Sequence, residues 1–343
     1  MATARKDGPN VSDDNSNALI ARAFFYAITL PDTEAPYNHA SLKVFYPARL
    51  TNSDEERNTG LVPAAAEKAP FPIVIMLPGI NVGPESYSWL AHELALAGIV
   101  MVTFTHVAEE MPGYVSLTPG LDITALQPDQ YGTRPSATTV APIIDALHRA
   151  NAEGVLQGQL DLDRIVLGGH SAGGTVALLN ADPDWFDGVV AAFSYGAHSA
   201  AATALGYEQG DMFTLPGKLP TLVMGGTRDG CIANSAARYG SAGETSPTAA
   251  VERTFDEAIG SQRGDCFLAI IEGANHFSLA YPADHSTGRP FIDMATTRPD
   301  EAIRDTLSQL IIQFVRQVSG NDGDKVEALL QAPNDLLRKT AVR

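Results

Sequence analysis

The sequence has few basic residues, and nowhere do five or more of them form a run. It contains 23 lysines and arginines against 40 aspartates and glutamates, which gives a formal net charge of −17. A surface of this sign repels nucleic-acid phosphate, so we expect no nucleic-acid partner. With 18% charged and 45% hydrophobic residues, the composition is typical of a globular protein.

Cysteine and long apolar segments are also scarce. The two cysteines, Cys231 and Cys266, cannot form a four-ligand zinc site on their own. The chain has no run of about 18 apolar residues, so the sequence predicts no transmembrane segment. The stretch MATARKDGPNVSDDNSNA at the N-terminus is polar and lacks the apolar centre of a secretory signal. We therefore expect a cytoplasmic location, or one peripheral to a membrane that holds the substrate.

Short apolar runs alternate with helical patterns from residue 72 to residue 318. Continuous apolar runs are typical of strands that are buried on both faces. The runs lie at 72–77, 99–104, 164–169, 188–196, 219–226 and 266–273. This alternation predicts an α/β fold, with a mainly parallel sheet of about eight strands and helices on both faces.

We expect a single domain over residues 18–318, because no linker-like change of composition interrupts residues 70–318. Residues 1–17 form a polar N-terminal tail in this interpretation. Residues 319–343 form a C-terminal extension with a short helical stretch and no assigned role.

The remaining segments before and between the apolar runs carry weaker patterns. Residues 24–29 and 42–47 are rich in aromatic and β-branched side chains and predict a pair of antiparallel strands. Residues 51–60 are polar and predict a solvated loop. Two long segments, 107–134 and 197–218, predict irregular loops or lids near the ends of strands.

The stretch VLGGHSAGGTVALL contains the pattern G-x-S-x-G centred on Ser171. The pattern directly follows a predicted buried strand and opens a predicted helix, which is the context of a nucleophile elbow. Gly169 and Gly173 suit this turn because two backbones approach closely there. Ser171 is therefore the candidate nucleophile. The alternative is a serine that caps an ordinary glycine-rich turn.

A serine nucleophile needs a base, and the base needs an acid that orients it. Asp229 follows the predicted strand at 219–226, and His276 follows the one at 266–273, in the chain order serine, acid, histidine. Asp256 falls in a helix-like stretch and Asp265 precedes its strand, so both fit the role of the acid less well. The alternatives are a solvated turn aspartate and a loop histidine stacked on its neighbouring phenylalanine.

Two backbone N–H groups should form an oxyanion hole. One is the N–H of Ala172, directly after the nucleophile. The other should come from the loop LPGINVG, where Pro78 has no N–H and Gly79 or Ile80 must donate. We favour Ile80.

The substrate pocket should be lined by side chains near these strand ends. The candidates that we single out are His106, Met111, Tyr114, His170, His198 and Phe277. Other apolar residues of the two long segments could line the pocket or simply pack the loops onto the domain: Val115, Leu117, Leu121, Leu126, Leu205, Tyr207, Met212 and Phe213.

Four stretches of the sequence together resemble one group of proteins. They are MLPGINVGPESYSWLAHELALAGIVMV, GHSAGG, PTLVMGGTRDG and EGANHF, and the resemblance covers about residues 70–318. They are similar to the esterases of the α/β-hydrolase superfamily, in the group of chlorophyllases, cutinase-like polyester hydrolases and dienelactone hydrolases. The resemblance implies the α/β-hydrolase fold, the catalytic triad Ser171, Asp229 and His276, and oxyanion donors at Ile80 and Ala172.

The resemblance also bears on the cysteines. It implies that neighbouring strand ends carry the loops of Cys231 and Cys266, so that a disulfide between them is one alternative. Two buried thiols, as expected in a reducing cytosol, are the other.

The resemblance is closest to the chlorophyllases, which implies cleavage of chlorophyll to chlorophyllide and phytol through an acyl-enzyme. It implies no cofactor and no bound metal, since any magnesium would belong to the substrate. A lipase, a cutinase-like enzyme or a general carboxylesterase with a small hydrophobic ester substrate is the alternative within this class. A catalytically silent hydrolase fold that binds a hydrophobic ligand is the alternative outside it. The oligomeric state is not predicted.

Overall fold

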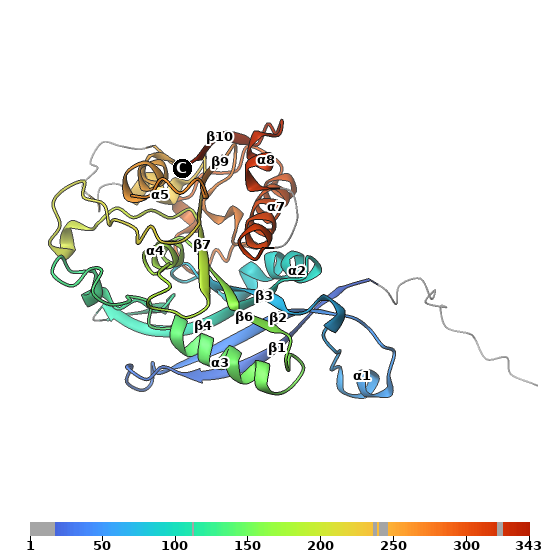
Figure 1. Ribbon diagram of the computed structural model, residues 1–343. Helices are drawn as coiled ribbons and strands as arrows, with labels where there is room; N and C mark the ends of the chain where they lie inside the picture. The colour runs from blue at the N-terminus through green and yellow to red at the C-terminus, as the bar shows by residue number, and fades with distance from the viewer. Residues whose placement is uncertain (1–17, 112, 236–238, 240–245, 321–324) are drawn as a thin grey trace, which may run out of the picture.

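The computed structural model describes residues 18–111, 113–235, 239, 246–320 and 325–343 (Figure 1). Within these residues ten strands form one mixed sheet in the order β1-β2-β4-β3-β6-β7-β8-β9-β10, and β5 pairs with β4 outside this path. The strands are β1 (Ile20–Thr29), β2 (His39–Ala48), β3 (Phe71–Leu77), β4 (Val100–Met111), β5 (Tyr114–Leu117), β6 (Leu160–His170), β7 (Val189–Tyr195), β8 (Thr221–Gly226), β9 (Cys266–Ile271) and β10 (Leu337–Val342). The predicted α/β class is confirmed, although the sheet has more strands than expected.

Helices cover both faces of the sheet (Figure 1). The α-helices are α1 (Asp54–Thr59), α2 (Ser88–Leu96), α3 (Val140–Ala152), α4 (Ala172–Leu179), α5 (Gly230–Ser235), α6 (Ala249–Arg253), α7 (Asp300–Val318) and α8 (Val326–Gln331). None of the helices in the described ranges is long and apolar enough to cross a membrane.

The strand β3 shows why the central sequence runs are apolar at every position. Its side chains point alternately to the two faces of the sheet. Ile73 and Ile75 belong to the core that α3 covers. Val74 and Met76 belong to the opposite core, which α2, α7 and α8 cover. A strand with helices on both faces has no solvent-facing side, so no polar alternation remains in the sequence.

The outer strands are antiparallel, in contrast to the parallel centre. At one edge β1 pairs with β2, which pairs with β4, as the strands predicted at 24–29 and 42–47 suggest. At the other edge β10 pairs with β9. The sequence predicts that residues 319–343 form an extension outside the domain, yet β10 is part of the sheet. It carries Arg338 and Lys339, as exposed edge strands commonly do, so its pattern is not that of a buried strand.

Two predicted loops contain regular structure. Residues 51–60 hold the helix α1, which Ser53 caps by accepting the N–H of Glu56 and which Gly60 ends in the left-handed conformation. The segment 107–134 begins as the outer part of β4, which turns back as β5 in an antiparallel hairpin. Two of the four residues of β5, Tyr114 and Val115, are exposed, so the hairpin has no buried apolar run that would predict a strand.

The strands β3, β4, β6, β7, β8 and β9 run parallel, so their carboxyl ends lie at one edge of the sheet. The loops at this edge contain Gly79 after β3, Ser171 after β6, Asp229 after β8 and His276 after β9. The fold therefore gathers residues that are far apart in the sequence.

Candidate functional site

Ser171 occupies a strained turn between β6 and α4. Its backbone has φ 54° and ψ −127°, a conformation that residues other than glycine rarely adopt. The turn leaves no room for side chains around it. A Cβ on Gly173 would lie 2.2 Å from the carbonyl oxygen of Leu77, and one on Gly169 would lie 2.2 Å from the carbonyl oxygen of Gly173. The glycines of the motif are thus required by backbone contact.

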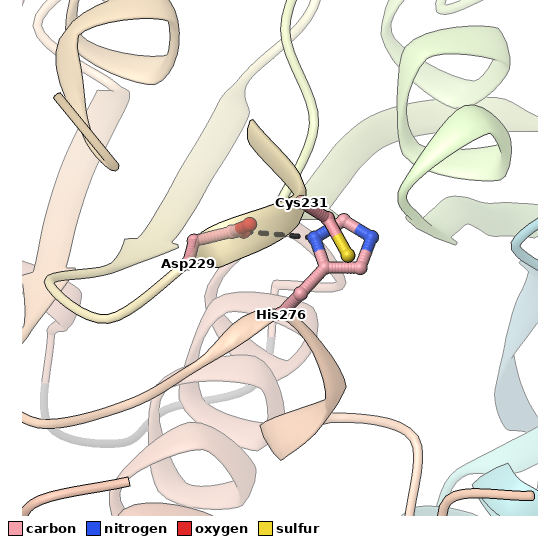
Figure 2. A group of neighbouring side chains, drawn as sticks. All are labelled: Asp229, Cys231 and His276. Atoms are coloured by element: carbon pink, nitrogen blue, oxygen red, sulfur yellow. Dashed lines mark hydrogen bonds and ion pairs between the residues drawn. The ribbon is translucent and has the colours of Figure 1, made fainter. Parts of the chain in front are cut away.

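Asp229 and His276 form a buried hydrogen-bonded pair. His276 Nδ1 lies 2.8 Å from Asp229 Oδ2, and the two side chains are 5% and 0% exposed (Figure 2). The other carboxylate oxygen, Oδ1, accepts the N–H of Ile232 at 2.8 Å. Burial alone would lower the pKa of His276, but the Asp229 carboxylate offsets this and raises the pKa above its usual value. The pair therefore favours a protonated Nδ1 and a well-oriented imidazole.

The histidine of this pair and the serine line one cavity. Ser171, His276, Ala172 and Ile80 all line a cavity of about 420 Å³. Such a volume lies within the usual range of small-molecule sites. Its other lining residues are Asn81, Val82, Tyr114, His170, Thr175, Gly196, Ala197, His198, Cys231, Ile232, Ser235, Tyr239, Phe277, Gly288 and Arg289.

The backbone N–H groups of Ile80 and Ala172 are available at this cavity, whereas that of Gly79 is not. The N–H of Gly79 already donates to the hydroxyl of Tyr87 at 3.0 Å. No acceptor among the described residues takes the N–H of Ile80. Ala172 is the first residue of α4, so its N–H has no partner within the helix. The geometry thus favours Ile80 over Gly79 as the donor from the loop after β3.

Four of the predicted pocket residues line the cavity, namely Tyr114, His170, His198 and Phe277. His198 is buried, and burial lowers its pKa to about 4, so its imidazole is neutral. The prediction for His106 is wrong. His106 is a buried residue of β4, its Nε2 lies 3.0 Å from the carbonyl oxygen of Tyr37, and it is not among the residues that line the cavity. The side chain of Met111 lies outside the described part of the structure.

The two long segments contribute less to the cavity than expected. Most of their apolar residues pack in the core around α4 and α6, as the alternative interpretation had it: Leu121, Leu126, Leu205, Tyr207 and Phe213. A further wall of the cavity, which the sequence does not predict, comes from the residues after Asp229 and from residues 288–289. It includes Ile232, Ser235, Tyr239 and the cation Arg289. For the residues after Asp229, their proximity to Asp229 in the sequence was the one feature that could have predicted this position.

The disulfide alternative is wrong, because Cys231 and Cys266 are both free and buried. Cys231 lies in α5, beyond the carboxyl end of β8. Cys266 begins β9 and pairs with Thr221 at the start of β8. The two residues lie at opposite ends of neighbouring parallel strands, separated by at least about 16 Å for a six-residue strand. A disulfide spans less than about 7 Å between Cα atoms.

Asp229, Cys231 and His276 together have the donor types of a metal site, with ligand atoms within 4.8 Å of one another (Figure 2). Two of these donors are already bound to each other in the Asp229–His276 hydrogen bond. Burial and the Asp293 carboxylate raise the pKa of the Cys231 thiol to about 12, whereas a metal ligand must be a thiolate. The group therefore fits an acid–base pair with a neutral thiol beside it better than a metal centre.

Asp293 is a second carboxylate at the site and is not among the residues that the sequence predicts there. Its Oδ1 accepts the N–H of Gly230 at 2.8 Å, and its Oδ2 accepts the N–H of Phe277 at 3.2 Å. Burial and the nearby Asp229 raise the pKa of Asp293. No sequence motif surrounds this residue, and only its position in the fold reveals it.

Comparison with models of known protein families finds no match, and no curated protein matches the chain significantly. Any function for this chain must therefore be argued from its site.

Proposed function

We propose that the protein is a serine hydrolase of carboxylic esters with the α/β-hydrolase fold. The observation that carries this proposal is the buried hydrogen bond from Asp229 to His276, whose imidazole lines the same cavity as Ser171, a serine with a positive φ. A strained serine and an oriented imidazole on one cavity are what acyl transfer needs. The parallel strand order and the elbow after β6 agree with the proposed fold.

In the first half of the reaction Ser171 becomes acylated. His276 Nε2 removes the proton of Ser171 Oγ as the oxygen attacks the ester carbonyl. The N–H groups of Ile80 and Ala172 hold the negative oxygen of the tetrahedral intermediate. The ester C–O bond then breaks, the alcohol leaves with the proton from His276, and the acyl group remains on Ser171. Asp229 stabilises the imidazolium throughout.

In the second half water releases the acid. His276 takes a proton from water, and the resulting hydroxide attacks the acyl carbonyl. The tetrahedral intermediate collapses, Ser171 Oγ leaves and regains its proton from His276, and the carboxylic acid departs. No group beyond the chain and water is required.

The substrate class follows from the cavity. Its volume of about 420 Å³ suits the acyl or the alcohol part of an ester, and the remainder of a larger substrate would extend into solvent. Val82, Ile232 and Phe277 supply apolar wall. Because the cavity can hold only a part of a large ester, both chlorophyll, which the sequence resemblance implies, and small esters are candidate substrates.

A fluorophosphonate probe tests the proposal. We expect covalent labelling of wild-type protein at Ser171, located by mass spectrometry, and none of the S171A variant. Hydrolysis of p-nitrophenyl butyrate should parallel the labelling. Absence of labelling would instead support a silent fold that binds a hydrophobic ligand. Incubation with chlorophyll a then decides the substrate: turnover of the nitrophenyl ester alone would remove the chlorophyllase interpretation.

A further inference from the structure

The peptide bond that follows His276 is held at both of its polar groups. Its carbonyl oxygen, on His276, lies 3.0 Å from His170 Nε2. Its N–H, on Phe277, donates to Asp293 Oδ2 at 3.2 Å. A peptide unit is planar and includes the Cα atom of the preceding residue. Fixing both polar groups therefore fixes the Cα from which the imidazole of His276 extends.

The His170 side of this contact reaches the nucleophile and the oxyanion loop. His170 directly precedes Ser171 and is fully buried, which lowers its pKa far below the usual value and keeps it neutral. A carbonyl only accepts, so Nε2 carries the proton and Nδ1 accepts from the hydroxyl of Tyr87 at 3.0 Å. That hydroxyl in turn accepts the N–H of Gly79. One tautomer thus satisfies every group in the chain of hydrogen bonds.

The Asp293 side reaches the acid. Asp293 Oδ1 accepts the N–H of Gly230, which directly follows Asp229. The backbone around Asp293 lies directly on this glycine: a Cβ on Gly230 would be 2.5 Å from the carbonyl oxygen of Ile292 and 2.8 Å from the Cα of Asp293. One carboxylate therefore ties the loop of the acid to the loop of the base.

We propose that His170 and Asp293 are positioning residues that clamp the His276–Phe277 peptide and so align His276 with Ser171, Asp229 and the oxyanion loop. This inference rests on the proposed function. Both side chains act through the backbone of His276. Removing either one frees one end of the same peptide.

A double-mutant cycle tests the clamp. We expect H170N and D293N each to lower kcat for p-nitrophenyl butyrate by about 100-fold with little change in KM, as for a displacement of a catalytic group. H170Q, whose amide nitrogen can take the place of Nε2, should recover part of the loss. The matched controls H148N and D305N change exposed residues on α3 and α7 and should leave kcat unchanged.

The double variant H170N/D293N decides whether the two residues share one task. Because either change already frees the peptide, we expect its loss of kcat to stay close to that of the worse single variant. Losses that multiply to about 10⁴-fold would show two independent roles and overturn the clamp. Urea unfolding of each variant checks that it folds. If H170N does not fold, H170Q takes its place in the cycle, and its partial loss should likewise not multiply with that of D293N.

A second measurement separates the clamp from the proposed function. In protein labelled with ¹⁵N-histidine, the Nδ1 proton that His276 shares with Asp229 should give a slowly exchanging resonance in the wild type. We expect H170N and D293N to shift or broaden it, and H148N to leave it unchanged. A wild type without esterase activity would overturn the proposed function and still allow this measurement. An unchanged resonance in both clamp variants would overturn the clamp.

Discussion

The loop of Ser171 and the loops of Asp229 and His276 are held in place by different means. Backbone contact fixes the first, because Gly173 abuts the carbonyl oxygen of Leu77. In the other two loops, backbone contact at Gly230 is joined by side-chain hydrogen bonds from His170 and Asp293. Backbone contact demands glycine at a fixed spacing, whereas hydrogen bonds can come from any part of the chain. The first arrangement therefore leaves a motif in the sequence and the second does not.

The largest expected effect comes from Ser171, where chemistry and strain can be separated. S171A and S171G should both lower kcat by about 10⁶-fold, because neither has a nucleophile. S171G should unfold with a free energy about 1 kcal/mol higher than S171A, since glycine accepts a φ of 54° without strain. Esterase assays and urea unfolding measure the two effects. Equal stability of the two variants would contradict the strain.

The next effect concerns the orientation of His276. D229N should lower kcat by about 10⁴-fold while the protein stays folded, because an amide favours the wrong tautomer of the imidazole. D256N serves as the matched control, since Asp256 is exposed and was the competing candidate for the acid. Similar losses in both variants would argue against Asp229 as the orienting acid.

A single methyl group at position 173 should disrupt the close backbone packing of the turn. G173A should lower the unfolding free energy by about 3 kcal/mol and slow fluorophosphonate labelling of Ser171, because the new Cβ collides with the carbonyl oxygens of Leu77 and Pro78. G260A is the control, since a Cβ there meets no atom within 4 Å among the described residues. Normal labelling of G173A would show that the turn can shift.

The charges beside His276 should move the pH dependence of activity in opposite directions. The base acts when neutral, so kcat/KM should rise as the pH increases through the pKa of His276. Asp293 raises this pKa and Arg289 lowers it. D293N should therefore move the acidic limb of the profile to lower pH, and R289Q should move it to higher pH. Shifts in the same direction would refute this electrostatic account.

The smallest effect is expected at Cys231. C231A should retain esterase activity within about twofold, because the thiol is neutral and is not used in the proposed reaction. Iodoacetamide should modify this thiol slowly in the folded protein, since burial raises its pKa to about 12. Titration of the unfolded, unreduced protein should give two free thiols. A rapid, inactivating modification would show that the thiol is reactive.

The comparison of the loops also explains what could be predicted from the sequence. Buried parallel strands appear as apolar runs, so the core of the sheet and the positions of Ser171, Asp229 and His276 after it were predictable. The edge strand β10 was not, because two of its exposed residues, Arg338 and Lys339, are charged. Tyr87 fits the apolar stripe of the α2 segment, and nothing in that pattern shows that its hydroxyl meets His170.

The error at the cysteines has a related cause. Adjacent strands in a parallel sheet bring together residues at the same end, and Cys266 stands at the start of its strand whereas Cys231 follows the end of the neighbouring one. Arg289 and Asp293 follow irregular chain after His276, where periodicity gives no information. Contacts of this kind depend on how a loop folds back, which no local pattern records.

The order of strands along the chain has a consequence for biosynthesis. His170, next to the nucleophile, precedes His276 by 106 residues. A ribosome that adds roughly 5–20 residues per second needs about 5–20 s to cover this interval. The nascent chain therefore carries its serine well before it carries the base, and an unactivated serine is a weak nucleophile. During synthesis the proposed hydrolase is inert until its final third has emerged and β9 has joined the sheet.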